Sequence, residues 1–469
     1  MSSRRIVSLR PAARVGLVLR ARTGTASVAL ACCFGGAAAQ GLPELYEAAR
    51  GYDAAYLGAK AQAESATYKA AQTDALRLPN VGLSAGATQS EADPPTAFTT
   101  NAIGQKVAVP GSGDRRGTTN LQAGISATHP LYNPANSASI SQAQRSLEVA
   151  SADLQAAEQD LIVRVAQAYF DVLGAQDTLT TAQANKRAIS EQLASAKRNF
   201  EVGTATITDT REAQARFDLA GAQELAADND LQTKRIALDV LVGRSNVKPL
   251  PLVARVVLPG VVPADVGAWV SMADEQHPSV RKARLALDIA KLDTEKARAN
   301  DGPTVDLTGT VGTSRTTGSG TTAPGNTLSA SVGVLFKMPL YNGGSLQNRI
   351  KETIALEEKS RNDFDAARRG VAQATRVSFF GLQSLQAQVK ALEAAESSSQ
   401  LALEATQLGY KVGVRVNLDV LNAQTQLFTT KRDLAKARYD VVLNGLKLRQ
   451  ASGQLKADDV KAVNPLFTK

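Results

Sequence analysis

Hydrophobic and polar residues alternate with a period of two in four stretches of the chain. Gly, Ser, Thr or other polar residues fill most of the intervening positions. This alternation predicts four β-strands of about ten residues, long enough to cross a bilayer when tilted. Gly/Thr/Ser/Pro-rich loops are expected near residues 89–118 and 315–326. The apolar positions are Val81, Leu83, Ala85 and Ala87; Leu121, Ala123, Ile125 and Ala127; Val305, Leu307, Gly309 and Val311; and Leu328, Ala330, Val332, Val334, Phe336 and Met338.

Long stretches rich in Ala, Gln, Leu and charged residues lie between the strand patterns and predict helices. Residues 43–77 and 264–300 form the first pair, and each ends at a proline motif. Residues 135–200 and 344–410 contain no proline, and a heptad spacing of leucines indicates coiled-coil-like packing. At 1.5 Å per residue these helices are rods of about 100 Å. Each rod is expected to turn at a glycine, Gly203 or Gly413, before a return helix at 206–242 or 416–452.

The two halves of the chain are repeats. Pro130-Leu131-Tyr132-Asn133 recurs as Pro339-Leu340-Tyr341-Asn342, an offset of 209, and Val202-Gly203 recurs 210 residues later as Val412-Gly413. Upstream of the strands the offset is 224. We therefore predict a first repeat at 40–258, a second at 259–455 and a solvated C-terminal tail at 456–469.

The charge balance and the cysteines both point to an export signal. The chain has 53 Lys+Arg and 44 Asp+Glu, a formal net charge of +9. Residues 1–39 hold six arginines and no acid, so the remainder carries 47 against 44, or +3, which gives no argument for nucleic-acid binding. An apolar stretch ending Ala37-Ala38-Ala39 predicts cleavage after Ala39. Both cysteines, Cys32 and Cys33, lie in this segment, and their context also allows a lipid-anchored N-terminus.

Four membrane-length strands cannot close a barrel alone, because the smallest bacterial barrels use eight. Open sheet edges are not tolerated in lipid, so several chains must share one barrel. Two chains would give eight strands and three would give twelve. Small residues on the inward face favour the wider pore, and hence three chains.

The residues offer no catalytic or metal chemistry. His129 and His277 are 148 positions apart without matching ligands, and the mature chain is expected to be free of cysteine. No Gly-x-Ser-x-Gly elbow or phosphate-binding loop is present. The sequence therefore predicts a protein that is not an enzyme and that uses no cofactor or metal.

With these motifs, the chain resembles the TolC family of outer-membrane efflux and secretion channels. The resemblance covers residues 41–455 and rests on the paired Pro-Leu-Tyr-Asn motifs and the two glycine turns. It implies an α+β membrane protein whose four transmembrane strands per chain contribute to a twelve-stranded β-barrel shared by a homotrimer in outer-membrane lipid. The long antiparallel coiled-coil-like helices would form a periplasmic α-barrel. A periplasmic adaptor (membrane fusion protein) and an inner-membrane RND or ABC transporter would dock on it.

The resemblance also assigns residues at the helical turns. Family members close the periplasmic end with a polar latch, and the matching positions are Thr208, Asp209, Tyr410 and Arg415. An acidic ring at the entrance corresponds to Asp419, whereas Asn422 replaces a usual second acid, which argues against strong cation selectivity. The expected adaptor-docking residues are Val202, Gly203 and Thr204 with Val412, Gly413 and Val414. Without the resemblance, Tyr410 would be read as packing and the two acids as partners of helix dipoles.

The predicted function is a passive exit channel of a tripartite efflux or type I secretion system, gated at its periplasmic end. One alternative is a lipid-anchored drug-efflux component of the outer membrane. Another is a non-channel periplasmic coiled-coil scaffold or adaptor, although adaptors lack four membrane-length strands in duplicated pairs. Drugs, metals and polypeptides all fit as cargo, because selection lies mainly in the pump.

Overall fold

The computed structural model describes residues 40–253, 260–319 and 324–467. The predicted export signal and the predicted boundary between the repeats, at residues 258 and 259, lie outside these ranges. The first repeat contains α1 (Leu42–Tyr52), α2 (Ala54–Asp74), η1 (Ala75–Arg77), β1 (Asn80–Ala92), β2 (Phe98–Thr100), β3 (Lys106–Ala108), β4 (Arg116–Tyr132), α3 (Pro134–Glu201) and α4 (Ile207–Val242). The second contains α5 (Val266–Gln276), α6 (Pro278–Ala299), β5 (Thr304–Thr317), β6 (Gly325–Lys337), α7 (Ser345–Lys411) and α8 (Asn417–Ala451), followed by α9 (Ala457–Val463) and η2 (Asn464–Leu466).

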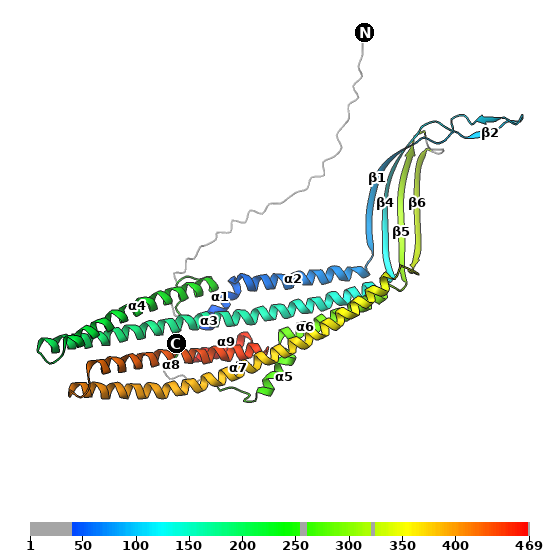
Figure 1. Ribbon diagram of the computed structural model, residues 1–469. Helices are drawn as coiled ribbons and strands as arrows, with labels where there is room; N and C mark the ends of the chain where they lie inside the picture. Colours follow the sequence, from blue (N-terminus) through cyan, green and yellow to red (C-terminus); the bar gives the residue numbers. More distant parts are fainter. Residues whose placement is uncertain (1–39, 254–259, 320–323, 468–469) are drawn as a thin grey trace, which may run out of the picture. The chain divides into compact units, whose positions relative to one another are not determined.

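The two long helices, α3 and α7, are uninterrupted over 68 and 67 residues. Each packs against the return helix that follows it, α3 against α4 and α7 against α8 (Figure 1). Toward the strands, α2, α3, α6 and α7 pack in that order as a row of neighbours. No helix within the described ranges combines the length and the apolar character that crossing a membrane requires.

Each repeat begins with two helices where the sequence predicted one. The first breaks at Asp53, whose Oδ1 accepts a hydrogen bond from the Tyr56 backbone N–H at 2.8 Å. The second breaks at His277, whose Nδ1 accepts from the Ser279 N–H at 3.1 Å, and Pro278 occupies the first position of the new helix. Both side chains satisfy N–H groups that a helix start leaves unpaired. Because Asp53 and His277 are 224 residues apart, the break belongs to the repeat.

The four long strands form one antiparallel sheet in the order β1-β4-β5-β6. Register places Leu83 opposite Ile125, Ile125 opposite Val311 and Val311 opposite Ala330, so apolar positions line up across all four strands. We call this side the apolar face. Its large side chains are exposed, including Leu83 at 79% and Val332 at 83%.

The opposite side, the polar face, carries small or hydroxylated residues in matching rows. Over its central rows none of these residues is charged or aromatic. The rows contain Gly82, Ser84, Gly86, Thr88 and Ser90 on β1; Thr118, Asn120, Gln122, Gly124, Ser126 and Thr128 on β4; Thr308, Thr310, Gly312, Ser314 and Thr316 on β5; and Thr327, Ser329, Ser331 and Gly333 on β6.

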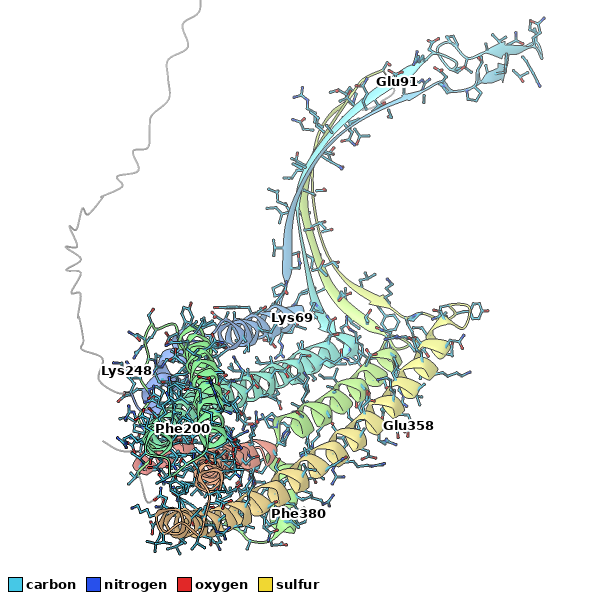
Figure 2. All side chains as sticks on the ribbon, turned by 60° about the vertical axis from the view of Figure 1, so that its left-hand side comes forward. Lys69, Glu91, Phe200, Lys248, Glu358 and Phe380 are labelled. Atoms are coloured by element: carbon cyan, nitrogen blue, oxygen red, sulfur yellow. The ribbon has the colours of Figure 1, made fainter. Side chains whose placement is uncertain are left out.

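The loop predicted at residues 89–118 is shorter than expected, because both of its ends belong to the long strands. Strand β1 continues to Ala92, near the Glu91 labelled in Figure 2, and β4 begins at Arg116. A small hairpin of β2 and β3 lies between them. The alternation of apolar residues ends earlier, but the backbone ladder continues because it does not require apolar side chains.

The main core lies where α1, α3 and the C-terminal residues meet. Tyr169 is fully buried, and Phe467 packs edge-on against its ring at a centroid distance of 5.2 Å. The expectation of a solvated tail is therefore wrong: α9 and η2 are folded, and Phe467 is 5% exposed. Asp459 forms an ion pair with Arg449 and accepts a hydrogen bond from the Lys456 N–H at 2.9 Å, so it is not a free tail residue.

The start of each repeat is held by matching ionic contacts of opposite polarity. In the first repeat Arg50 on α1 lies 3.7 Å from Glu158 on α3. In the second, Asp274 on α5 accepts two hydrogen bonds from Arg368 on α7, at 2.6 and 2.7 Å. Asp274 lies 224 residues after Arg50, and Arg368 lies 210 residues after Glu158, so these are equivalent positions of the two repeats. The same two elements therefore meet in each repeat with the charges exchanged.

The end of each return helix is also equivalent in the two repeats. Gly243 follows α4 with φ +66°, and a Cβ there would meet the Tyr52 ring at the end of α1. Gly453 follows α8 with φ +75°, and a Cβ there would meet the backbone of Gln276 and His277 at the end of α5. The sequence offsets of 210 and 224 thus identify positions that are equivalent in three dimensions.

Candidate functional site at the helical turns

The two helical turns have the same backbone hydrogen bonds. In the first, the Asn199 carbonyl accepts from the N–H groups of Thr204 and Ala205 at 2.8 and 3.1 Å. In the second, the Gly409 carbonyl accepts from Val414 and Arg415 at 2.9 and 3.1 Å. Each turn is made by the predicted glycine, with φ +76° at Gly203 and +79° at Gly413, a conformation that glycine adopts without steric cost.

In the first turn, Asp209 is held at the start of α4. Its Oδ2 accepts from the Thr206 N–H at 2.9 Å and from the Thr206 hydroxyl at 2.7 Å, and Thr206 Oγ1 accepts from the Asp209 N–H at 3.2 Å. This reciprocal arrangement is a capping box. Thr208 is exposed and forms no side-chain hydrogen bond within the described chain. Asp209 therefore stabilises its own helix start.

In the second turn, Asp419 lies beside Arg415. The Arg415 guanidinium is 3.6 Å from Asp419 Oδ2, and the Val416 N–H donates to the same carboxylate at 3.4 Å. Valine has no side-chain acceptor, so this cap is only half of the one at Asp209. Asp419 is therefore held more weakly and is freer to exchange partners.

Three polar contacts near the turns join the first hairpin of helices to the second, and in one of them Gln192 Nε2 on α3 donates to Asn417 Oδ1 at the start of α8. Asn199 Nδ2 donates to the Tyr410 hydroxyl at 3.2 Å, and Arg216 donates to Asn422 Oδ1 at 3.1 Å. The Tyr410 ring also packs against an apolar cluster that includes Leu403. Within one chain, Tyr410 and Arg415 form no hydrogen bond or ion pair with Thr208 or Asp209; Asp209 and Asp419 have partners in their own turns, whereas Tyr410 and Asn422 have partners on the other hairpin.

Asn199 and Arg216, like Gln192 and Asn417, are residues that reasoning from the sequence missed. Asn199 lies inside a matched motif, but its repeat counterpart is Gly409, so the repeat does not mark it as polar. The side chain of Arg415 occupies that space instead, since a Cβ on Gly409 would lie 2.9 Å from Arg415 Cγ. Arg216 corresponds to Gln426, so no shared motif marks it either.

The tips of the turns expose apolar side chains. Val202 is 72% exposed, Val412 65% and Val414 78%, and Thr204 is also exposed. Three exposed valines at two neighbouring turns form an apolar surface of the kind that marks an interaction site.

Further from the tips, a buried polar contact fastens α3 to α8. The Tyr439 hydroxyl donates to Asp177 Oδ2 at 2.6 Å, a length typical of a hydrogen bond to an ionised acceptor. Burial raises the pKa of Asp177, and the hydrogen bond from Tyr439 opposes that rise. Burial, followed by the neighbouring Asp177, raises the pKa of Tyr439. The two hairpins are thus joined in the body by this contact, and nearer the tips by two part-buried polar contacts, Asn199–Tyr410 and Gln192–Asn417, and by the exposed Arg216–Asn422 contact.

Comparison with known proteins agrees with this architecture. The sequence profile of the family described as "Outer membrane efflux protein" matches residues 45–244 and 269–454. "Outer membrane protein TolC" of Vibrio cholerae is 32% identical over 428 residues, covering 91% of this chain and 93% of that protein. "Alkaline protease secretion protein AprF" of Pseudomonas aeruginosa is 35% identical over 311 residues, covering 66% of this chain and 64% of that protein.

A solved structure shares the fold. The Campylobacter jejuni CmeC outer membrane channel superposes with a TM-score of 0.73 at 15% identity, covering 91% of this chain and 90% of that chain. The duplicated rods, the glycine turns and the two-faced sheet define an outer-membrane exit channel. The chain belongs to the outer membrane efflux protein family, and the relatives it matches are channel proteins and not enzymes.

Proposed function

We propose that three copies of this chain form one exit channel in the outer membrane, without catalysis of their own. The two-faced sheet with two open edges carries this proposal. Strands β1 and β6 lie at the edges and pair on one side only within the described chain. Unpaired backbone groups are not tolerated in lipid, so the edges of neighbouring copies must pair. Three four-stranded sheets then give the twelve-stranded barrel.

The two faces of the sheet suit the two environments of such a barrel. From Phe336, opposite Val305, to Leu121, opposite Arg315, the apolar face spans eleven residue rows, which is about 25 Å of height when the strands tilt. The polar face would line the lumen. Its hydroxyl and glycine rows carry no charge over the central region, so they fit cargo of either sign.

The helical turns supply the gate and the docking surface. Tyr410, Arg415, Thr208 and Asp209 would latch the closed end, and the Asn199 contact to Tyr410 adds a link within each chain. A single neutral hydrogen bond contributes only about 0.5–1.5 kcal/mol, so a docking partner is able to break three copies of such a latch. Asp419 and Asn422 would line the constriction.

A periplasmic adaptor would dock at the apolar tips, at Val202, Gly203, Thr204, Val412, Gly413 and Val414. An inner-membrane RND or ABC transporter would deliver the substrate. The names of the relatives, an outer membrane protein and a protease secretion protein, support both an efflux and a type I secretion role.

Single-channel conductance of the purified protein in a planar bilayer tests the proposal. We expect small, uniform current steps from a pore that is mostly closed, and larger steps when the latch residues are replaced. A protein that forms trimers but gives no steps, even with the latch replaced, would not be a channel. No steps, no oligomer and recovery in the inner-membrane or soluble fraction would instead indicate a periplasmic scaffold.

A further inference from the structure

The row of helices α2, α3, α6 and α7 contains one joint between repeats, where α3 meets α6. Its outer helices, α2 and α7, each have a neighbour on one side only within this row. Lys69 on α2 and Glu358 on α7 mark these two ends in Figure 2. Because the repeats are equivalent, a second copy placed beside α7 would form the same joint again, between α7 and the α2 of that copy.

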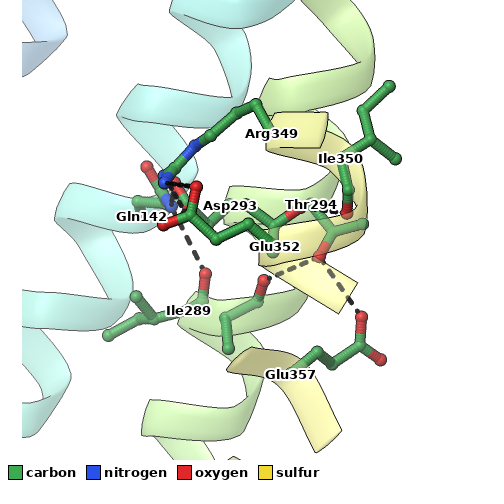
Figure 3. Close-up of polar contacts among 10 residues, drawn as sticks. Gln142, Ile289, Asp293, Thr294, Arg349, Ile350, Glu352 and Glu357 are labelled. Atoms are coloured by element: carbon green, nitrogen blue, oxygen red, sulfur yellow. Dashed lines mark hydrogen bonds and ion pairs between the residues drawn. The ribbon is translucent and has the colours of Figure 1, made fainter. Parts of the chain in front are cut away.

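The internal joint is polar and well defined. Gln142 Nε2 on α3 donates to the Ile289 carbonyl at 3.3 Å and to Asp293 Oδ1 at 3.5 Å (Figure 3). Asp293 also accepts from Arg349 on α7 at 2.9 Å, which fixes its carboxylate. One contact of the joint is therefore a side chain of α3 that reaches a carboxylate of α6.

The two offsets identify the counterparts of these residues. Since α3 and α7 are uninterrupted helices, the offset of 210 at the turns holds along their whole length, and Gln142 corresponds to Glu352. The offset of 224 makes Lys69 the counterpart of Asp293. The amide–acid pair Gln142–Asp293 of the internal joint thus corresponds to an acid–base pair, Glu352–Lys69, at the joint between copies. The exchanged Arg50–Glu158 and Asp274–Arg368 pairs show that the repeats preserve contacts in this way.

Both counterparts are available for such a contact. Lys69 is exposed and forms no ion pair within the described residues. The Glu352 side chain is 57% exposed, and its ion pair is with Arg349 on its own helix, at 3.0 Å. The contact therefore brings together a free ammonium and an exposed carboxylate.

The apolar part of the joint gives an independent sign of a missing neighbour. Beside Gln142, Ala138 on α3 and Leu292 on α6 line one groove, and Ala138 is only 8% exposed. The counterpart of Leu292 is Tyr68 on α2, which is 67% exposed. The counterpart of Ala138 is Asn348 on α7, which is also exposed. A second copy at this joint would cover the Tyr68 ring.

We propose that α7 of one copy packs against α2 of the next, with Glu352 accepting a hydrogen bond from Lys69 and Asn348 lying over Tyr68. This inference rests on the proposed trimer and identifies the helical contact that closes it. The other pair of the internal joint, Lys282 with Asp153 at 2.8 Å, has no equivalent, because Gly58 stands in place of the lysine. The Glu352–Lys69 pair is therefore the diagnostic contact.

Cross-linking tests the geometry directly. The described chain contains no cysteine, so Lys69→Cys with Glu352→Cys introduces a single reactive pair. A short bismaleimide is the reagent of choice, because a direct disulfide requires Cα atoms within about 7 Å. We expect covalent dimers and trimers on a denaturing gel. The matched control is Thr67→Cys with Glu352→Cys, since residue 67 lies at the same depth but about 200° around the helix from residue 69.

A charge series tests the contact without a cross-linker. Lys69→Asp alone places two carboxylates together and is expected to lower the temperature at which the oligomer dissociates. Adding Glu352→Gln recreates the Gln142–Asp293 contact of the internal joint and is expected to restore that temperature. Lys60→Asp is the control, because its counterpart Arg284 lies over the Phe364 ring on α7 of its own repeat.

The outcomes separate this inference from the proposed trimer. Specific cross-links together with rescue by the double variant would support the joint. Trimers by light scattering that show neither the cross-link nor the rescue would overturn the joint and leave the trimer standing. A wild-type protein that remains monomeric in detergent and in membranes would overturn both.

Discussion

Replacing Tyr439 with Phe is expected to destabilise the protein by an amount that grows with pH. The substitution removes the hydroxyl that donates to Asp177 at 2.6 Å and leaves the ring in place. Loss of the hydrogen-bond donor to a partly buried carboxylate lowers the free energy of unfolding by about 1.5–3 kcal/mol while the carboxylate is ionised. Once the carboxylate is protonated, most of that cost disappears.

The sign of the pH dependence follows from the shift at Asp177. Burial raises the pKa of this carboxyl in the folded state, so its contribution to stability is greatest in acid and is lost as pH rises through the folded pKa. The Tyr439 hydrogen bond lowers that pKa. Without it, the folded pKa of Asp177 rises further, and the loss of stability between about pH 4 and pH 7 becomes larger.

Tyr169→Phe provides a matched control. Tyr169 is also buried, but its hydroxyl donates to the neutral Leu250 carbonyl at 2.9 Å. Its loss should cost about 0.5–1.5 kcal/mol at any pH in this range. The assay is the urea midpoint of each purified variant in detergent at acid and neutral pH. Equal pH dependence of the two variants would refute the assignment of an ionised Asp177 as the acceptor.

Three further predictions concern the turns and the constriction. In a thermal melt, Gly243→Ala should destabilise the protein more than Gly203→Ala. Both glycines have positive φ, a conformation that costs alanine about 1–2 kcal/mol, but only at Gly243 would the added Cβ also meet a ring, that of Tyr52. Tyr410→Phe with Arg415→Ser should increase single-channel conductance, and an unchanged conductance would remove both from the gate. Asn422→Asp should raise the permeability of cations over anions severalfold, measured as a reversal potential in a salt gradient; no shift would place residue 422 away from the pore.

Local signals accounted for most of the fold. The rods predicted at residues 135–200 and 344–410 are α3 and α7 to within one residue at each end, because a proline-free stretch ends at a glycine that adopts positive φ. The helix break at His277 also had a local signal, Pro278, which occupies the first position of the following helix. The interpretation of that segment as one helix gave this proline too little weight.

Contacts between distant segments were beyond reach of the sequence. Asn199 and Tyr410 are 211 residues apart, and their hydrogen bond depends on how two hairpins of helices pack. Phe467 lies in a stretch that looks like a polar tail, and only docking against Tyr169 and Phe170 reveals it as a core residue. Local pattern reports which face of an element is apolar, and it does not report which partner covers that face.

The exchanged ion pairs at the start of each repeat bear on how a duplicated chain avoids folding incorrectly. Two similar halves invite the wrong partnership, in which the first helix of one half docks on the long helix of the other. With the polarity reversed, α1 on α7 would place Arg50 beside Arg368, and α5 on α3 would place Asp274 beside Glu158. Both exchanged arrangements oppose like charges, which repel. The reversed charges therefore favour the arrangement in which the first helix of each half docks on the long helix of its own half.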